Sequence, residues 1–171
     1  MPLLLPVHNI EPRFGKNCWL AENATITGDV VCGDECSFWF QSVVRGDVNK
    51  IRLGDRVNVQ DGAIIHCTHR RTETHLGDNV SIGHRAILHG CRVGDNVLIG
   101  MGAIVMDEAV IPDNVLIAAG AVVTEGKQLE SGFIYAGTPA RQLKPLDPEK
   151  LRGEVERIAA AYVKYAGWYR V

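Results

Sequence analysis

The chain has 171 residues, with 18 Lys and Arg against 20 Asp and Glu. This length suits one domain with a continuous core, and the balanced charge excludes the basic surface that binds nucleic acid or an anionic membrane. The apolar residues 1–6 are too short to cross a bilayer and lack the flanks of a signal peptide. We therefore expect a cytoplasmic protein with no nucleic-acid or membrane partner.

Five cysteines are an odd number, and their spacing matches no disulfide framework. We expect them to be reduced and mostly buried. The pair Cys32-x-x-x-Cys36 has a spacing that occurs in metal sites, but we interpret both residues as small side chains that face a core. The five are Cys18, Cys32, Cys36, Cys67 and Cys91.

In chain order, residues 1–17 contain Pro2, Pro6 and Pro12 and predict an irregular lead-in with one extended segment. Aliphatic residues recur from Leu20 onward, and from Leu53 they recur at intervals of six. Gly, Asp or Asn commonly follows each of them, and a small or aliphatic residue stands four positions later. The strict series are Leu53, Val59, Ile65; Leu76, Ile82, Leu88; Val93, Ile99, Val105; and Ile111, Ile117, Val123.

A period of six excludes an α-helix, whose period is 3.6, and also alternating hairpin strands, whose period is two. It is typical of a parallel β-helix in which three hexapeptides form one coil of a triangular prism. The aliphatic residues then stack inside, while Gly, Asp and Asn form the corners. We predict an all-β single domain spanning residues 1–171, with the β-helix at about 18–128.

Three departures from the six-residue period fall at one corner of the prism. The step from Val43 to Leu53 is ten residues, the step from Ile65 to Leu76 is eleven, and the step from Leu88 to residue 93 is five. We interpret the two longer steps as excursions from the prism.

The repeat stops after Val123, and residues 129–146 read as an ordered exit segment. A C-terminal α-helix is predicted over residues 147–168, with Asp147 as its N-cap. Its apolar face includes Val155, Ala159 and Tyr162. We expect this helix to lie along one face of the prism.

Three histidines, His66, His84 and His89, can be placed on the prism from the repeat alone. His66 and His89 each follow the inward residue of the third strand of a coil, one coil apart, so their backbones should lie about 4.7–4.9 Å apart. Two imidazoles at this spacing can reach one metal ion, since Zn–N distances are about 2.0–2.1 Å. His84 falls on the preceding face and must serve a neighbouring molecule. A single outward histidine is more often a surface residue, but this phase favours a metal site shared within a homotrimer.

Several ordered motifs resemble the γ-class carbonic anhydrase family, and the resemblance covers essentially the whole chain. They are Val44-Arg45-Gly46-Asp47, Asn58-Val59-Gln60-Asp61-Gly62, Ile65-His66, Gly83-His84 and His89-Gly90-Cys91.

The resemblance implies a left-handed β-helix trimer with Zn²⁺, or alternatively Fe²⁺ or Co²⁺, at each subunit interface. His66 and His89 of one subunit and His84 of the next would be the metal ligands. The implied reaction is the reversible hydration of CO₂ to bicarbonate by hydroxide on the metal.

The resemblance also implies roles for other polar residues. Gln60 would lie beside the metal-bound water or bicarbonate, supported by Asn58, and Tyr135 would contact bicarbonate or the metal-bound water. The implied interface set of charged residues is Arg45, Asp47 and Asp61.

Two positions depart from the best-known branch of the family. Val48 stands where that branch has a glutamate, and Glu73 is the sole carboxylate of the short segment 67–75. Because proton removal limits a fast hydratase, these departures predict slow turnover.

Two other functions are compatible with the repeat. One is a hexapeptide acyltransferase that uses an acyl-CoA, although the chain lacks the long loop with a catalytic histidine that is usual in those enzymes. The other is a non-catalytic metal-binding scaffold trimer.

Overall fold

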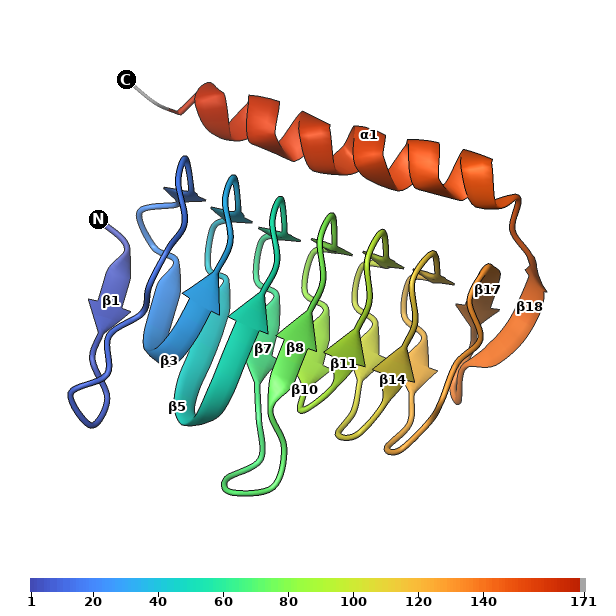
Figure 1. Cartoon of the computed structure of the whole chain (residues 1–171), viewed down its shortest axis with the longest axis horizontal. Helices are drawn as coiled ribbons and strands as arrows, with labels where there is room; N and C mark the ends of the chain where they lie inside the picture. The colour runs from blue at the N-terminus through green and yellow to red at the C-terminus, as the bar shows by residue number, and fades with distance from the viewer. Residues whose placement is uncertain (170–171) are drawn as a thin grey trace.

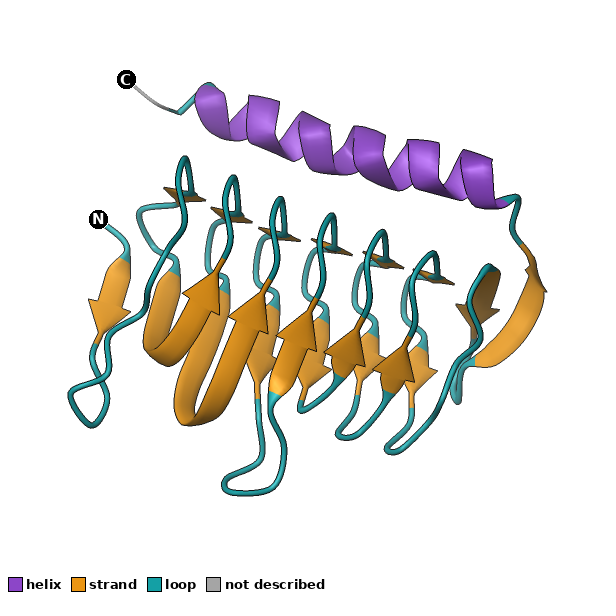
Figure 2. Cartoon of the chain, in the orientation of Figure 1, coloured by secondary structure: helices purple, strands orange, loops and turns teal. Residues whose placement is uncertain are grey.

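The computed structural model describes residues 1–169, apart from the side chains of Pro148 and Leu151. Its body is a parallel β-helix, with one long helix laid along it (Figures 1 and 2). Strands one coil apart pair in parallel, as the hexapeptide period predicts. The all-β prism with a C-terminal helix is therefore confirmed.

The prism has three faces. The histidine face comprises the first halves of β3 (Thr25–Cys32) and β5 (Val43–Leu53), followed by β7 (Ile64–His66), β10 (Ile87–His89), β13 (Ile104–Val105) and β16 (Val122–Val123). The polar face comprises the second halves of β3 and β5, then β8 (Thr74–Leu76), β11 (Arg92–Val93) and β14 (Val110–Ile111). The helix face comprises β2 (Trp19–Leu20), β4 (Ser37–Phe38), β6 (Asn58–Val59), β9 (Ser81–Ile82), β12 (Leu98–Ile99), β15 (Leu116–Ile117) and β17 (Phe133–Ala136).

The predicted aliphatic residues form three buried columns inside the prism. Each column takes one residue from each coil, in register with its neighbours above and below. Burial of these side chains is the main stabilising term of the fold. The columns are Val44, Ile65, Leu88, Val105 and Val123; Phe38, Val59, Ile82, Ile99 and Ile117; and Leu53, Leu76, Val93 and Ile111.

One column residue gives a direct test of this packing. Ile99 is fully buried in the column of the helix face, so Ile99→Ala should lower the free energy of unfolding by about 2–5 kcal/mol. Leu143→Ala is the matched control, because Leu143 is 64% exposed and should change stability by about 0.5 kcal/mol or less. Urea denaturation of both variants measures the difference, and equal losses would contradict the assigned packing.

An aspartate ladder joins successive coils at the corner between the polar and helix faces. Each aspartate side chain accepts a hydrogen bond from the backbone N–H one coil earlier, with N···O distances of 2.7–2.8 Å. Glycine precedes each of these aspartates except Asp113, and space requires these glycines. A Cβ on Gly54, for example, would lie 2.3 Å from the Asp78 carboxylate. This explains the recurrent Gly-Asp pair of the sequence. The ladder is Asp34, Asp55, Asp78, Asp95 and Asp113.

The corner between the histidine and polar faces holds the departures from the period, as predicted, but one of them takes another form. The step from Val43 to Leu53 is not an excursion, because β5 continues around the corner as one strand paired with the equally continuous β3. Gly28 and Gly46 pair at the bend, where a Cβ on Gly28 would lie 2.3 Å from the Gly46 carbonyl oxygen. Residues 67–73 do leave the prism, as the loop between β7 and β8 (Figure 1).

At the two ends, irregular segments extend the coil. Near the start, β1 (Leu3–Leu5) pairs with β3 and is the extended segment expected in the lead-in. At the other end, β17 pairs in parallel with β15, so the coil continues beyond residue 128, where the sequence pattern placed its end. The antiparallel β18 (Arg141–Pro145) then leads to the helix.

The helix α1 (Pro148–Gly167) runs back along the helix face (Figure 1). Asp147 caps it as predicted, because its side chain accepts hydrogen bonds from the N–H groups of Glu149 and Lys150. Val155 and Ala159 are buried against the prism. In the described part of the chain, no helix is long and apolar enough to cross a membrane.

Candidate metal centre

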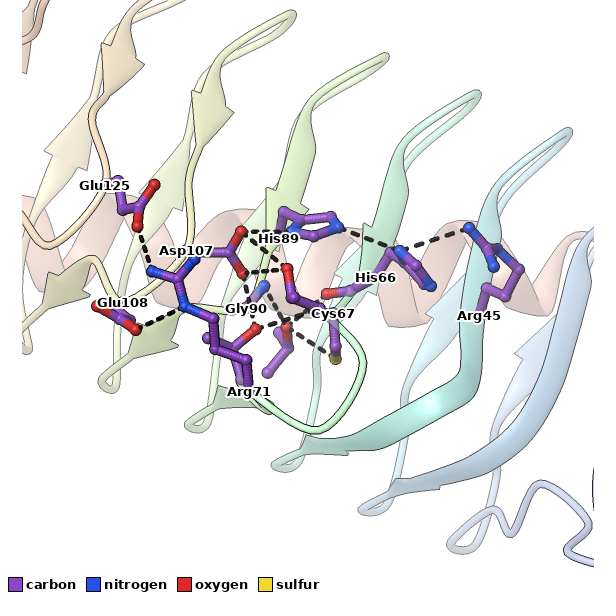
Figure 3. Close-up of polar contacts among 12 residues, drawn as sticks. Arg45, His66, Cys67, Arg71, His89, Gly90, Asp107, Glu108 and Glu125 are labelled. Carbon is purple, nitrogen blue, oxygen red and sulfur yellow. Dashed lines mark hydrogen bonds and ion pairs between the residues drawn. The ribbon is translucent and has the colours of Figure 1, made fainter.

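His66 and His89 form a stacked pair at the ends of β7 and β10. The two residues are in register on neighbouring strands, which is the placement that the repeat predicts. Nδ1 of His66 lies 3.1 Å from Nε2 of His89, and both rings are largely buried, with 15% and 32% of the side chains exposed. The pair thus brings two ring nitrogens together at one point of the histidine face (Figure 3).

The outer nitrogens of the pair contact carboxylates. His66 Nε2 lies 3.1 Å from Asp47 Oδ1, and His89 Nδ1 lies 3.1 Å from Asp107 Oδ2. Burial acts to raise the pKa of Asp47, but hydrogen bonds from Arg45 and His66 outweigh it and lower that pKa below its usual value. Burial also acts to raise the pKa of Asp107, but the hydrogen bond from Thr72 and the contact with His89 outweigh it, and the pKa lies below its usual value. Both carboxylates are therefore ionised and accept the imidazole N–H.

This arrangement fixes which nitrogen of each ring carries the proton. Because Asp47 and Asp107 only accept, His66 is protonated on Nε2 and His89 on Nδ1. Arg45 agrees with this assignment, since its Nη2 donor lies 3.4 Å from His66 Nδ1 and requires a lone pair there. Burial, with the positive charge of Arg45, lowers the pKa of His66 and favours the neutral ring. The neutral His66 ring directs Nδ1 toward His89 Nε2, 3.1 Å away.

The donor set fits a metal ion. Tetrahedral zinc with Zn–N of about 2.0–2.1 Å holds its nitrogens roughly 3.3 Å apart, close to the 3.1 Å between His66 Nδ1 and His89 Nε2. A carboxylate on the outer nitrogen of each ring is the usual support of a metal-binding histidine, since it orients the ring and raises its basicity. His66 and His89 could therefore hold a metal, with Asp47 and Asp107 as their supports.

Asp107 was missed by the sequence reading, although it lies one coil after the His89-Gly90 pair. The loop between β7 and β8 holds it, because Thr72 donates to Oδ1 at 2.7 Å and Thr68 donates to Oδ2 at 3.1 Å. One coil contains 18 residues, so the position 18 residues after His89 could have been identified from the sequence as a neighbour of His89. The loop thus contributes to the site by orienting Asp107 (Figure 3).

Because Gly90 has no side chain, the Asp107 carboxylate can occupy the space beside it. A Cβ there would lie 1.9 Å from Asp107 Oδ1 and 2.2 Å from Thr72 Oγ1, and the backbone φ is +57°. Gly102 has a φ of +66°, yet a Cβ there meets no atom within 4 Å. Gly102→Ala should therefore cost about 1 kcal/mol of stability, the backbone cost alone. Gly90→Ala should cost about 1–3 kcal/mol more, because it displaces Asp107.

Urea denaturation and zinc titration of the two variants check this prediction. We expect weakened zinc binding in Gly90→Ala and unchanged binding in Gly102→Ala. Equal losses of stability with equal zinc affinity would show that Gly90 serves the turn alone.

His84 lies apart from the pair within one chain. It follows β9, and its Nδ1 contacts Asp61 Oδ2 at 2.8 Å. Among the described residues, His66, His84 and His89 form no common ligand cluster in a single chain. His84 is 44% exposed and lines a cavity of about 270 Å³ beside α1, together with Tyr162 and Tyr165. The three predicted ligands thus divide into a pair and a separate, accessible histidine.

The remaining predicted residues separate into two groups. Gln60 lies on the turn between β6 and β7, with its Nε2 donating to Asn58 Oδ1 at 3.0 Å, and Asn58 donates to Ser81. This is the predicted support of Gln60 by Asn58. Tyr135, in contrast, occupies the inward column after Ile117, is 3% exposed, and binds the backbone of Glu130 through its hydroxyl. Among the described residues no hydrogen bond joins Tyr135 to the histidine pair, so its contact with bicarbonate stays a prediction.

Glu73, the sole carboxylate of residues 67–75, lies with the polar face. Its Oε2 contacts His75 Nε2 at 2.8 Å, and its Oε1 lies 3.7 Å from Lys50 Nζ. The hydrogen bond with His75 lowers the pKa of Glu73, which keeps it ionised.

Comparisons with known proteins place the chain in a family. The model described as bacterial transferase hexapeptide (six repeats) matches residues 73–105 and 90–125. The chain is 40% identical to a carbonic anhydrase of Geobacillus kaustophilus, over 98% of this chain and 91% of that protein. It is 39% identical to gamma carbonic anhydrase 1, mitochondrial, of Arabidopsis thaliana, over 86% of this chain and 56% of that protein. The chain belongs to the γ-class carbonic anhydrase-like family.

Other members of this hexapeptide-repeat family carry less specific names. Protein YrdA of Escherichia coli is 38% identical over 98% of this chain and 94% of its own length. A hexapeptide transferase family protein from Anaplasma phagocytophilum superimposes with a TM-score of 0.92 at 38% identity, covering 98% of both chains. The hexapeptide repeat of the family forms a left-handed β-helix, so the predicted fold is confirmed in this respect also.

Proposed function

We propose that the chain is a metal-dependent enzyme that interconverts CO₂ and bicarbonate at a site shared between two subunits of a homotrimer. The observation that carries this proposal is the convergence of His66 Nδ1 and His89 Nε2, 3.1 Å apart, with an ionised carboxylate on the other nitrogen of each ring. Relatives named carbonic anhydrase support the reaction. His84 of a neighbouring subunit would be the third ligand.

Zinc is the proposed ion, with Fe²⁺ or Co²⁺ as alternatives that suit imidazole ligands. An ion with three neutral ligands lowers the pKa of a coordinated water toward about 7, which supplies hydroxide at neutral pH. The chain's own residues orient the reactants. Arg45 keeps Asp47 ionised beside His66. Gln60 donates its NH₂ group to Asn58 and would present its carbonyl oxygen to a bicarbonate hydroxyl.

The outward surface of the histidine face supports the trimer. Its strands carry a ladder of outward aliphatic side chains in register, whereas the equivalent positions of β5, β8 and β11 on the polar face carry Arg52, His75 and Arg92. An aliphatic ladder of this kind gains free energy when a second surface covers it. A cyclic arrangement would place it, with the histidine pair, against the His84 corner of the next copy. The ladder is Val43, Ile64, Ile87, Ile104 and Val122.

The test is CO₂ hydration by protein purified without oxygen, with the metal content determined on the same sample. We expect hydration in proportion to bound metal, and its loss in His66→Ala. His8→Ala is the matched control, because His8 lies in the lead-in and should retain full activity. Protein with full metal occupancy and no hydration above the buffer rate would overturn the proposal.

The same assay separates the other two functions. An acyltransferase would bind acyl-CoA with equal affinity before and after metal removal, and its hydration rate would stay at the buffer value. A non-catalytic scaffold would bind metal at one site per interface without hydrating CO₂. Acyl-CoA binding should be measured together with CO₂ hydration, because the matching family model and one similar structure are named as transferases.

A further inference from the structure

Three cysteines converge near the N-terminal end of the prism, away from the histidine pair. The sulfurs of Cys18, Cys32 and Cys36 all lie within 4.8 Å of one another, and the Cys18–Cys32 separation is 3.8 Å. Cys32 and Cys36 are buried, whereas Cys18 is half-buried at the edge of the cluster. Thus the expectation of reduced, mostly buried cysteines is confirmed, but these three form a cluster that the spacing of Cys32 and Cys36 alone did not reveal.

The repeat shows where sulfur replaces hydrocarbon. Cys32 pairs with Leu53, at the head of the column that continues through Leu76, Val93 and Ile111. Cys36 stands one coil before Val57 in a second column, and Cys18 one coil before Cys36. Later coils fill these inward positions with Leu, Ile or Val, and the first coils place three thiols there together.

The other two cysteines show what a core cysteine looks like in this chain. Cys67 contacts Thr74 and the Lys50 carbonyl, and Cys91 is fully buried. Neither belongs to a cluster of three ligand atoms among the described residues. The convergence of the Cys18, Cys32 and Cys36 thiols thus differs from the packing of single cysteines in the core, and it suggests a shared ligand.

The spacing of the cluster suits a metal ion. Tetrahedral zinc with Zn–S of about 2.3 Å holds its sulfurs roughly 3.8 Å apart, which matches the Cys18–Cys32 distance. A disulfide needs sulfurs about 2.05 Å apart, so this pair is not bonded. Thiolate ligands select soft or borderline cations such as Zn²⁺ over Mg²⁺ and Ca²⁺. Because Cys18 is half-buried, solvent can supply a fourth ligand.

We propose that Cys18, Cys32 and Cys36 form a second metal site, which binds Zn²⁺ through three thiolates and a water molecule. Binding replaces the three S–H protons, which leave to solvent, and no electron transfer is involved. The ion would link residues of two successive coils with the segment that enters the prism. Its role is structural, since the site is separate from the histidine pair and goes beyond the proposed carbonic anhydrase activity.

Cobalt substitution tests the site directly, because thiolate ligands give Co²⁺ an intense sulfur-to-cobalt charge-transfer band that histidine ligands do not. Reduced protein is stripped of metal and titrated with Co²⁺ without oxygen. We expect the band in the wild type and also in His66→Ala, where the histidine site is lost. We expect its loss in Cys18→Ala and Cys36→Ala, with one Zn²⁺ fewer per chain. Cys91→Ala is the matched control and should retain the band.

Stability gives a second readout. Zn²⁺ should raise the melting temperature of His66→Ala but not that of His66→Ala combined with Cys18→Ala. Cys18 is half-buried, so this variant keeps the fold even if the buried Cys36→Ala does not. A protein whose five thiols titrate as reduced, but which shows no charge-transfer band, would overturn the second site. That result would leave the carbonic anhydrase proposal intact, because hydration is measured on the histidine site.

Discussion

Mixed trimers of His66→Ala and His84→Ala chains are expected to regain metal sites that neither variant forms alone. Each variant by itself lacks one ligand at every interface. In a mixed trimer, one interface joins an intact His66–His89 pair to an intact His84. Random mixing makes roughly three quarters of the trimers mixed, so about a quarter of the wild-type metal content and hydration should return. Both chains carry Cys18→Ala, so that zinc on the cysteine cluster is not counted.

The controls for this experiment follow from the separation of His84 from the pair. Each variant must elute as a trimer, and mixing must start from chains refolded together, so that both variants can enter the same trimer. Chains that both carry His66→Ala should regain no metal. If His84→Ala alone keeps full zinc occupancy, or if co-refolding restores no metal, the ligand set does not cross a subunit interface.

Asp107→Asn is expected to lower the affinity for zinc by about 10–100-fold, the usual effect of removing a carboxylate behind a metal-binding histidine. The amide oxygen of the new side chain would still accept the His89 N–H, but it would lack the negative charge that raises the basicity of the ring. The variant should therefore keep its fold and its trimer while it binds zinc more weakly. Zinc titration against a chelator of known affinity, again with Cys18→Ala present, measures the change.

Glu108→Gln is the matched control, because Glu108 adjoins Asp107 in sequence but its carboxylate contacts Arg71 at the surface. It removes the same charge one residue away and should leave the affinity for zinc unchanged. Equal weakening in both variants would indicate a general effect of charge on the cation. Unchanged affinity in Asp107→Asn would exclude the carboxylate as a support of His89.

The sequence predicted best where the repeat applies. The stacked pair follows from its phase alone, because parallel coils place residues one period apart on the same face. Tyr135 follows the same phase: it falls 18 residues after Ile117 and so lies inside the prism, and the contact with bicarbonate that the family resemblance implies stays a prediction. The cysteine cluster also follows the phase, since Cys18 and Cys36 are 18 residues apart.

Other features depend on contacts that the period does not encode. Asp107 is oriented by Thr68 and Thr72, which come from a loop with no repeat of its own. The long strands β3 and β5 arise because two glycines pair at a corner, which requires knowledge of both coils at once. Side-chain networks of this kind appear only when the coils are stacked in three dimensions.

The division of the pair between two adjacent coils has a consequence for how such proteins can change in length. A coil contacts chiefly the coils directly above and below it, so stability accumulates by nearest neighbours. Insertion or deletion of a whole coil beyond residue 111 would therefore lengthen or shorten the prism without altering the distance between His66 and His89. The proposed metal site would stay within two adjacent coils, whereas the number of coils beyond it, and with it the stability of the protein, can vary.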